Sequence, residues 1–363
     1  MLKLDYRFAI EMLTSSGASL GQFPVSVDWE PAREHARLLG MRRRPPDVAA
    51  RGDTTVIEPV WDDEKLGEPY AVGARLIDGD VVCAVKREYF KPLALELSSE
   101  LVAMKALDAG DLFHFRILAY RQAPEAEDGH GLGFTVRDAT PPMRFVEAPL
   151  EELACASMEC GVGESDDVPV FIPQSVLDEA EAITREAGSN ETGGILIGSL
   201  RRDAAIHEIA VVVTAQIPAR HTHSKTTSLT FTAETWTAVQ RALDLRRSGE
   251  MMLGWWHSHP SFAFCNADCP RERRKTCSLQ KAFLSGDDLV LHRAVFPKAW
   301  QIALLANNAD AGLEFALYGW RGGVVHRRGF NILGARRGTG ESASQFLRET
   351  STGDIDHATP CQK

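Results

Sequence analysis

From residue 168 to residue 333 the sequence alternates buried-strand patterns with amphipathic helices, and this alternation restricts the fold to few architectures. The runs TGGILIGSL, HEIAVVVTAQI and MMLGWWHSHP predict strands, as do the later runs WQIALLANN, LEFALYGWRG and GVVHRRGF. An apolar helical period in PQSVLDEAEAITREAG predicts a helix that stops at Gly188, and FTAETWTAVQRALDLRRSG predicts a second helix that stops at a glycine. Strands interleaved with helices predict an α/β sheet covered by helices.

The remainder of the chain divides into three parts. Residues 1–150 contain β-branched and aromatic runs such as TTVIEPVW and DLFHFRILAYRQ, together with the helical pattern PAREHARLLGM, and predict a β-rich α+β domain. Residues 151–167 are rich in glycine and acidic side chains, which is typical of a linker. Residues 334–363 are polar and aperiodic, which predicts a disordered tail.

Composition excludes several classes of function. A net charge of −10 argues against a nucleic-acid or anionic-membrane surface, since such binding needs a face that neutralises phosphate. Asp5 and Glu11 interrupt the N-terminal apolar run, unlike in a signal peptide, and no run approaches the roughly 20 apolar residues of a membrane span. We therefore expect a cytoplasmic protein whose seven cysteines are thiols or metal ligands rather than disulfides.

The stretch GWWHSHP places His257 and His259 two residues apart at the end of a predicted strand. Residues two apart on a strand point to the same face, and Pro260 is expected to end the strand with both imidazoles at an exposed rim. Two imidazoles, one carboxylate and a water form a catalytic zinc arrangement. A second H-x-H pair, His221 and His223, lies in a polar run without a proline or a partnered acid, which predicts loop histidines.

Three segments together resemble the JAMM (MPN+) metalloprotease family. Its signature is a glutamate before a glycine-containing strand, then H-[ST]-H-P, then S-x-x-D. Here Glu191 precedes TGGILIG, HSHP follows WW, and FLSGDDLVLH contains Ser285 with Asp288 three residues later. The resemblance covers roughly residues 168–333 and implies a cytidine-deaminase-like mixed sheet with flanking helices.

The motif assigns the third metal ligand less directly than the two histidines. A cysteine-rich insertion, residues 261–283, separates the histidines from the S-x-x-D segment. Asp268 lies near the family's usual separation, but Cys265 occupies the place of the expected serine. Asp288 has its serine at the correct offset, and SGDDLVLH predicts a helix that begins with a capping serine and acidic residues. Asp288 is therefore favoured over Asp268 and over its neighbour Asp287.

The insertion carries a signal of its own, the pattern C-x3-C-x7-C. Three thiolates and one further ligand would form a second, structural zinc site. His292, one helical turn after Asp288, is a candidate for the fourth ligand. The alternative is three free thiols in an insertion loop. The cysteines concerned are Cys265, Cys269 and Cys277.

The resemblance implies hydrolysis of an amide bond by zinc-activated water. It assigns zinc to His257, His259 and Asp288. Glu191 would act as general base and then as general acid, and Ser285 would donate a hydrogen bond to the developing oxyanion. The cysteines need not act as nucleophiles.

The family's usual substrate is the bond after the C-terminal Gly-Gly of ubiquitin or a ubiquitin-like protein, and the chain is similar to bacterial members that accompany such modifier systems. We expect deconjugation or precursor maturation, with residues 1–150 recognising the modifier, its conjugates, or the cognate activating and conjugating enzymes. Three alternatives remain: a JAMM peptidase acting on a sulfur-carrier protein, a non-catalytic MPN scaffold, and a zinc-finger-like module built on the cysteines.

Overall fold

The computed structural model describes residues 6–43, 55–61, 69–76, 82–121, 144–219, 222–225, 228–260, 281–309 and 312–335. The chain divides into two compact units. The first comprises Met1–Arg144, Leu284–Ala303 and Tyr318–Arg327, and the second comprises Phe145–Phe283, Leu304–Leu317 and Arg328–Lys363. Mixed sheets with flanking helices and a β-rich N-terminal region confirm the expected fold class.

The elements have the following bounds. The helices are α1 (Glu30–Arg43), η1 (Arg87–Phe90), α3 (Lys91–Ala103), α4 (Glu151–Cys155), α5 (Gln174–Ala187), α6 (Ala233–Arg246) and α9 (Gly286–Val295). The strands of the N-terminal region are β1 (Tyr6–Thr14), β2 (Ser19–Val25), β3 (Thr55–Trp61), β4 (Pro69–Leu76), β5 (Val82–Val85) and β6 (Phe113–Arg121). The strands that follow are β7 (Phe145–Glu147), β8 (Ser157–Cys160), β9 (Val170–Pro173), β10 (Gly193–Asp203), β11 (Glu208–Pro218), β12 (Thr222–Lys225), β13 (Ser228–Phe231), β14 (Met251–Pro260), β15 (Ile302–Ala309), β16 (Gly312–Arg321), β17 (Val324–Arg328) and β18 (Phe330–Leu333). Across the described ranges, no helix combines the length and apolar character needed to cross a membrane.

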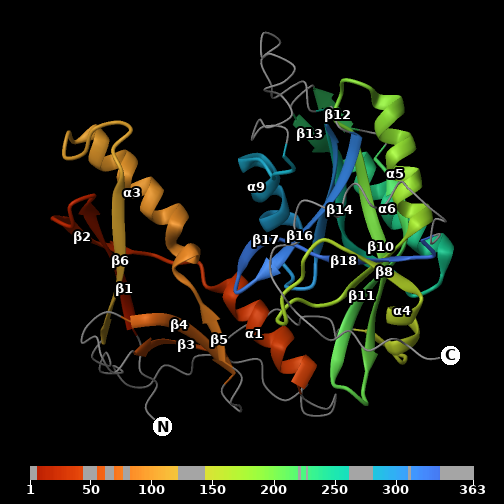
Figure 1. Ribbon diagram of the computed structural model, residues 1–363, viewed down its shortest axis with the longest axis horizontal. Helices are drawn as coiled ribbons and strands as arrows, with labels where there is room; N and C mark the ends of the chain where they lie inside the picture. The colour runs from red at the N-terminus through yellow and green to blue at the C-terminus, as the bar shows by residue number, and fades with distance from the viewer. Residues whose placement is uncertain are drawn as a thin grey trace, which may run out of the picture. The chain divides into compact units, whose positions relative to one another are not determined.

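Two small antiparallel sheets, β2-β1-β6 and β3-β4-β5, form the N-terminal part of the first unit. Helix α3 lies against the first sheet and α1 against the second (Figure 1). Alternate residues of β1, Phe8, Ile10 and Met12, point into a shared apolar core that includes Ala36 of α1 and Leu101 of α3. These helices and sheets therefore bury one common core.

A large sheet of order β17-β16-β15-β14-β10-β11-β9-β18-β8, with β7 added beside β10, contains the predicted histidine strand. Strand β14 lies between β15 and β10, so both of its edges are paired. The run Ile195–Ile197 of β10 has no exposed surface, as expected for a continuous apolar strand covered on both faces. The predictions of strands β10, β11 and β14 are confirmed.

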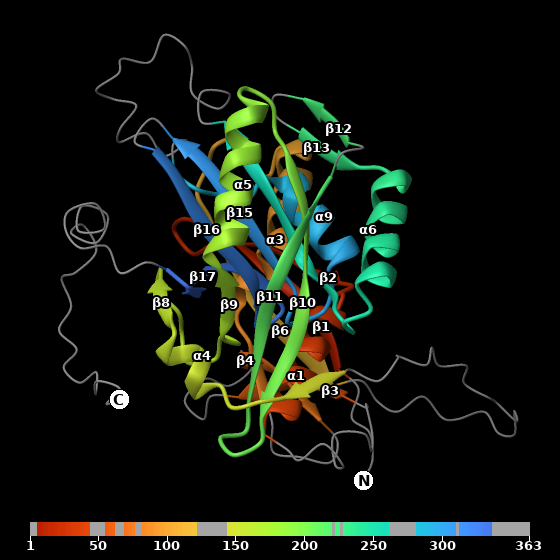
Figure 2. The ribbon, with the colours of Figure 1, turned by 90° about the vertical axis from the view of Figure 1, so that its right-hand side faces the viewer.

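Helix α5 lies alongside β9 and β11 (Figure 2). Its buried residues Val176, Leu177, Ala180 and Thr184 follow the helical period that the sequence indicated. Gly188 takes a positive φ of 63° and donates its N–H to the carbonyl of Thr184 at 3.3 Å, which ends the helix as predicted.

Several elements differ from the sequence predictions. The linker expectation does not hold for residues 151–160, which form α4 and β8, because main-chain hydrogen bonds to β18 hold a strand whose side chains are mostly polar. Helix α3 and strands β1 and β2 were not predicted. In α3 only Ala94 and Leu101 are fully buried, so its apolar period is weak. Helix α6 was predicted to stop at a glycine but ends at Arg246. The next residue, Arg247, takes the left-handed conformation (φ 48°) that is usual for glycine.

Close contacts around the start of β10 require glycine at position 194, and this requirement can be tested. A Cβ at Gly194 would lie 2.6 Å from the carbonyl oxygen of Ile217 and 2.6 Å from Nε1 of Trp256. We expect Gly194→Ala to lower the free energy of unfolding by about 1–3 kcal/mol, the usual cost of overpacking a core. Urea unfolding followed by tryptophan fluorescence measures this, with Gly163→Ala as the control because its Cβ would meet nothing within 4 Å. An unchanged midpoint for Gly194→Ala would contradict the steric account.

Candidate metal centre

Both histidines of the HSHP stretch are buried at the end of β14. His257 is 1% exposed and His259 is 2% exposed, so the expectation of an exposed rim is wrong. The cause is packing around an interior strand: the ring of Trp255 stacks on His257 with centroids 4.5 Å apart, and the ring of Phe283 lies 5.3 Å from that of His259. Pro260 ends the strand as predicted.

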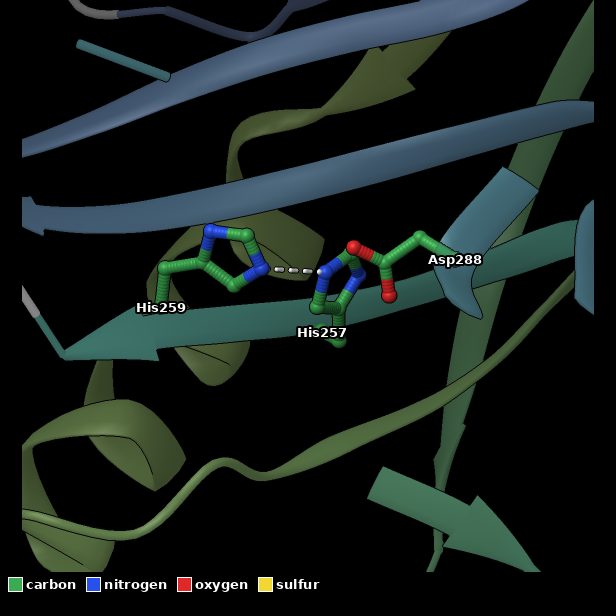
Figure 3. Close-up of side chains that lie close together, drawn as sticks. All are labelled: His257, His259 and Asp288. Atoms are coloured by element: carbon green, nitrogen blue, oxygen red, sulfur yellow. Dashed lines mark hydrogen bonds between the residues drawn. The ribbon is translucent and has the colours of Figure 1, made fainter. Parts of the chain in front are cut away.

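The two imidazoles converge on one point. Their Nε2 atoms lie 3.0 Å apart, with the ring planes at 71° (Figure 3). Together with a carboxylate oxygen of Asp288, their ligand atoms lie within 4.8 Å of one another. Two imidazoles and one carboxylate suit a catalytic zinc ion, which takes three protein ligands at roughly 2.0–2.2 Å and leaves a fourth position open. The donor set and its spacing therefore fit the metal that the sequence predicted.

Asp288 is held by the capping box of α9. Ser285 is the N-cap, and its Oγ accepts a hydrogen bond from the N–H of Asp288 at 3.2 Å. In return, Oδ2 of Asp288 accepts from the N–H of Ser285 at 2.7 Å. The predicted capped helix is confirmed, and the cap fixes the carboxylate that faces His257 in Figure 3.

The structure describes only one of the two alternative third ligands, Asp287. Asp287 is exposed and does not belong to the metal-competent group found among the described residues. Asp268 lies outside the described residues, so the choice between it and Asp288 stays a prediction. The structure brings Asp288 to the histidines.

Glu191, the predicted general base, is 4% exposed and lies between α5 and β10. Gly193, two residues later, is paired with His257 across the antiparallel ladder of β10 and β14. Thr192, between Glu191 and Gly193, is hydrogen-bonded to Ser258, the residue that separates the two histidines. The pairing therefore brings the backbone of Glu191 to the end of β14 that carries the imidazoles. No local sequence pattern predicted the contact of Ser258 with Thr192, because the two residues lie far apart in the chain.

The remaining predicted residues are only partly described. Cys265, Cys269 and Cys277 lie outside the described residues, so the second zinc site stays a prediction. Their suggested partner His292 is fully buried, and burial lowers its pKa to about 3, so its imidazole is neutral at neutral pH. Its ring stacks near Trp320, with centroids 5.3 Å apart.

Two further expectations are corrected. Of the cysteines in the described ranges, Cys83 and Cys160 are thiols, as predicted, whereas Cys155 is disulfide-bonded, so the prediction of thiols is wrong for that residue. His223 lies on β12, which pairs with β13, rather than in a loop, because main-chain pairing tolerates a polar, Thr-rich sequence. His221 lies outside the described residues.

Comparison with known proteins identifies the central part of the chain. Residues 173–268 match the family of prokaryotic homologs of the JAB domain (Prok-JAB). The chain contains a JAB domain. The matched range of this domain includes Glu191, His257 and His259 and ends before Ser285 and Asp288.

Other comparisons add little to the JAB match. No curated protein matches the sequence. The solution structure of protein DSY2949 from Desulfitobacterium hafniense aligns at 20% identity over 45% of this chain and 92% of that chain, with a TM-score of 0.31. That score is too low to support a statement about the fold.

Two neighbouring acids of α9 provide a matched test of the metal site. We expect Asp288→Ala to lose about one zinc ion per chain and Asp287→Ala to retain it, because both lie in the first turn but only Asp288 faces the histidines. Elemental analysis after dialysis against zinc-free buffer measures the stoichiometry. Equal zinc contents in the two variants would contradict the assignment of the third ligand.

Proposed function

We propose that this protein is a zinc-dependent peptidase or isopeptidase that cleaves after the C-terminus of a ubiquitin-like protein. The observation that carries the proposal is the convergence of Asp288 with buried His257 and His259, two histidines that lie in the range matched by the JAB domain. A buried glutamate on the adjoining end of the ladder adds the second group that hydrolysis needs.

The three side chains would hold zinc through Nε2 of His257, Nε2 of His259 and a carboxylate oxygen of Asp288. Zinc bound there would lower the pKa of a water molecule toward about 7, so that hydroxide is available for attack at neutral pH. The protein contributes the geometry: the capping box engages Oδ2 of Asp288 and so fixes the direction of the carboxylate. A ligand fixed in this way needs little reorganisation on binding.

Glu191 would transfer the proton, and Ser285 would stabilise the negative charge that develops on the carbonyl oxygen. Glu191 accepts a proton from the attacking water and delivers it to the leaving amine. The Oγ of Ser285 accepts a bond from the N–H of Asp288, and the hydroxyl hydrogen is still available for donation. That hydrogen would bond to the carbonyl oxygen as negative charge develops there.

The substrate class is proposed from the resemblance to metalloproteases that act on ubiquitin-like modifiers. The JAB match supports the coarser assignment, a peptidase or MPN-type function. The β-rich N-terminal part of the chain is the candidate for holding the modifier, its conjugate or an enzyme of the same system. Precursor maturation and deconjugation both require cleavage of one amide bond after the modifier's last residue.

The test uses a panel of bacterial ubiquitin-like proteins, each fused through a C-terminal Gly-Gly to a fluorescent protein. Glu191→Gln should lower kcat for cleavage by roughly 10²- to 10⁴-fold, the usual contribution of a general base, without loss of zinc. Glu186→Gln, an exposed glutamate on α5, is the matched control and should leave kcat unchanged.

Three results would contradict the proposal. Cleavage by Glu191→Gln at the wild-type rate would remove the general-base mechanism. Cleavage of a sulfur-carrier protein but of no ubiquitin-like fusion would assign a different substrate. A zinc-loaded wild-type protein that cleaves neither class would favour the scaffold alternative.

A further inference from the structure

Ser258 makes two hydrogen bonds to a single residue on the neighbouring segment. It is 1% exposed and lies between the two histidines on β14, so strand alternation turns its side chain away from the face that carries the imidazoles. Its N–H donates to the carbonyl of Thr192 at 2.8 Å, and its Oγ accepts from the N–H of Thr192 at 3.1 Å. Both main-chain groups of Thr192 are therefore bonded to Ser258.

This arrangement departs from a regular ladder. Gly193 is paired with His257, so Thr192 and Ser258 occupy the next position of the antiparallel pair. In a regular pair the two residues exchange two main-chain bonds. Here a side-chain hydroxyl accepts in place of the Ser258 carbonyl. The serine thus extends the hydrogen bonding of β10 one residue beyond the strand's first residue, Gly193.

The residue directly before this contact is Glu191. On its other side, the chain leaves α5 through a turn in which Gly188 N–H bonds to the carbonyl of Thr184 and Asn190 N–H bonds to that of Ala187. Glu191 therefore lies between a helix-ending turn and the Ser258 contact, and the carboxylate is 4% exposed.

We propose that Ser258 is a positioning residue for Glu191: its hydroxyl fixes the Thr192 peptide and thereby the reach of the glutamate toward the metal site. This inference rests on the proposed function for its effect on catalysis, whereas the contact itself can be tested without substrate. Ser258 does not touch the reacting atoms, and its loss alters no metal ligand.

Removing the hydroxyl takes the acceptor from the Thr192 N–H. Main-chain pairing through the Ser258 N–H remains, so the fold and the two imidazoles should be retained. A glutamate displaced by a fraction of an ångström to one ångström costs up to about 10²-fold in rate. We therefore expect Ser258→Ala to lower kcat by roughly 10- to 100-fold with little change in KM.

The experiment compares Ser258→Ala, Ser258→Thr and Ser199→Ala with the wild type as full-length, zinc-loaded proteins. Ser258→Thr retains a hydroxyl, and Ser199→Ala makes the same chemical change at a half-buried position on β10. Three quantities are measured: zinc per chain, amide hydrogen exchange of peptides covering residues 189–194, and kcat and KM for a cleavable fusion. Glu191→Gln is included as the reference for loss of the base.

The expected result is specific to Ser258→Ala: faster exchange at residues 189–194, unchanged zinc, and a lower kcat that Ser258→Thr restores. Unchanged exchange would overturn the proposed contact, whatever the activity. Faster exchange with unchanged kcat, while Glu191→Gln is inactive, would overturn the positioning role and leave the proposed function intact. Loss of zinc or of folding in Ser258→Ala would show a general structural role and would also overturn it. If Glu191→Gln were fully active, the proposed function itself would fail.

Discussion

The antiparallel pairing of β10 with β14 is the constraint on which the candidate site depends. The register that places Gly193 opposite His257 also brings the segment before β10 to the histidine end of β14. Close approach at this point requires glycine, since a Cβ at Gly194 would meet main-chain and indole atoms at 2.6 Å. A slip by one residue would turn every side chain of β14 to the opposite face and separate the imidazoles from Glu191.

Helix capping positions the proposed third ligand, Asp288. The sequence between His259 and Ser285 is long, but the entropic cost of closing a loop rises only slowly with the length of the loop. What a ligand needs is a fixed direction, and the capping box gives Asp288 one. The same carboxylate thus caps a helix with one oxygen and can bind a metal with the other.

Sequence patterns predicted the elements whose signals are local and periodic. The period of α5, the apolar runs of β10 and β11, and the serine cap of α9 are local, and the structure confirms them. Burial of His257 and the contact of Ser258 with Thr192 depend on neighbouring strands far away in the chain, so no local pattern reports them. Helix α3 and strand β8 were missed because weakly amphipathic or polar segments are held by tertiary packing and main-chain bonds.

We propose that the chain holds zinc through His257, His259 and Asp288, the capping aspartate of α9. Anomalous diffraction at the zinc absorption edge, on crystals of the zinc-loaded protein, tests it most directly. We expect an anomalous peak with both Nε2 atoms at about 2.0–2.1 Å from it and an Asp288 oxygen at about 2.0–2.2 Å. An absence of anomalous density between His257, His259 and Asp288, with zinc bound only elsewhere in the chain, would contradict it.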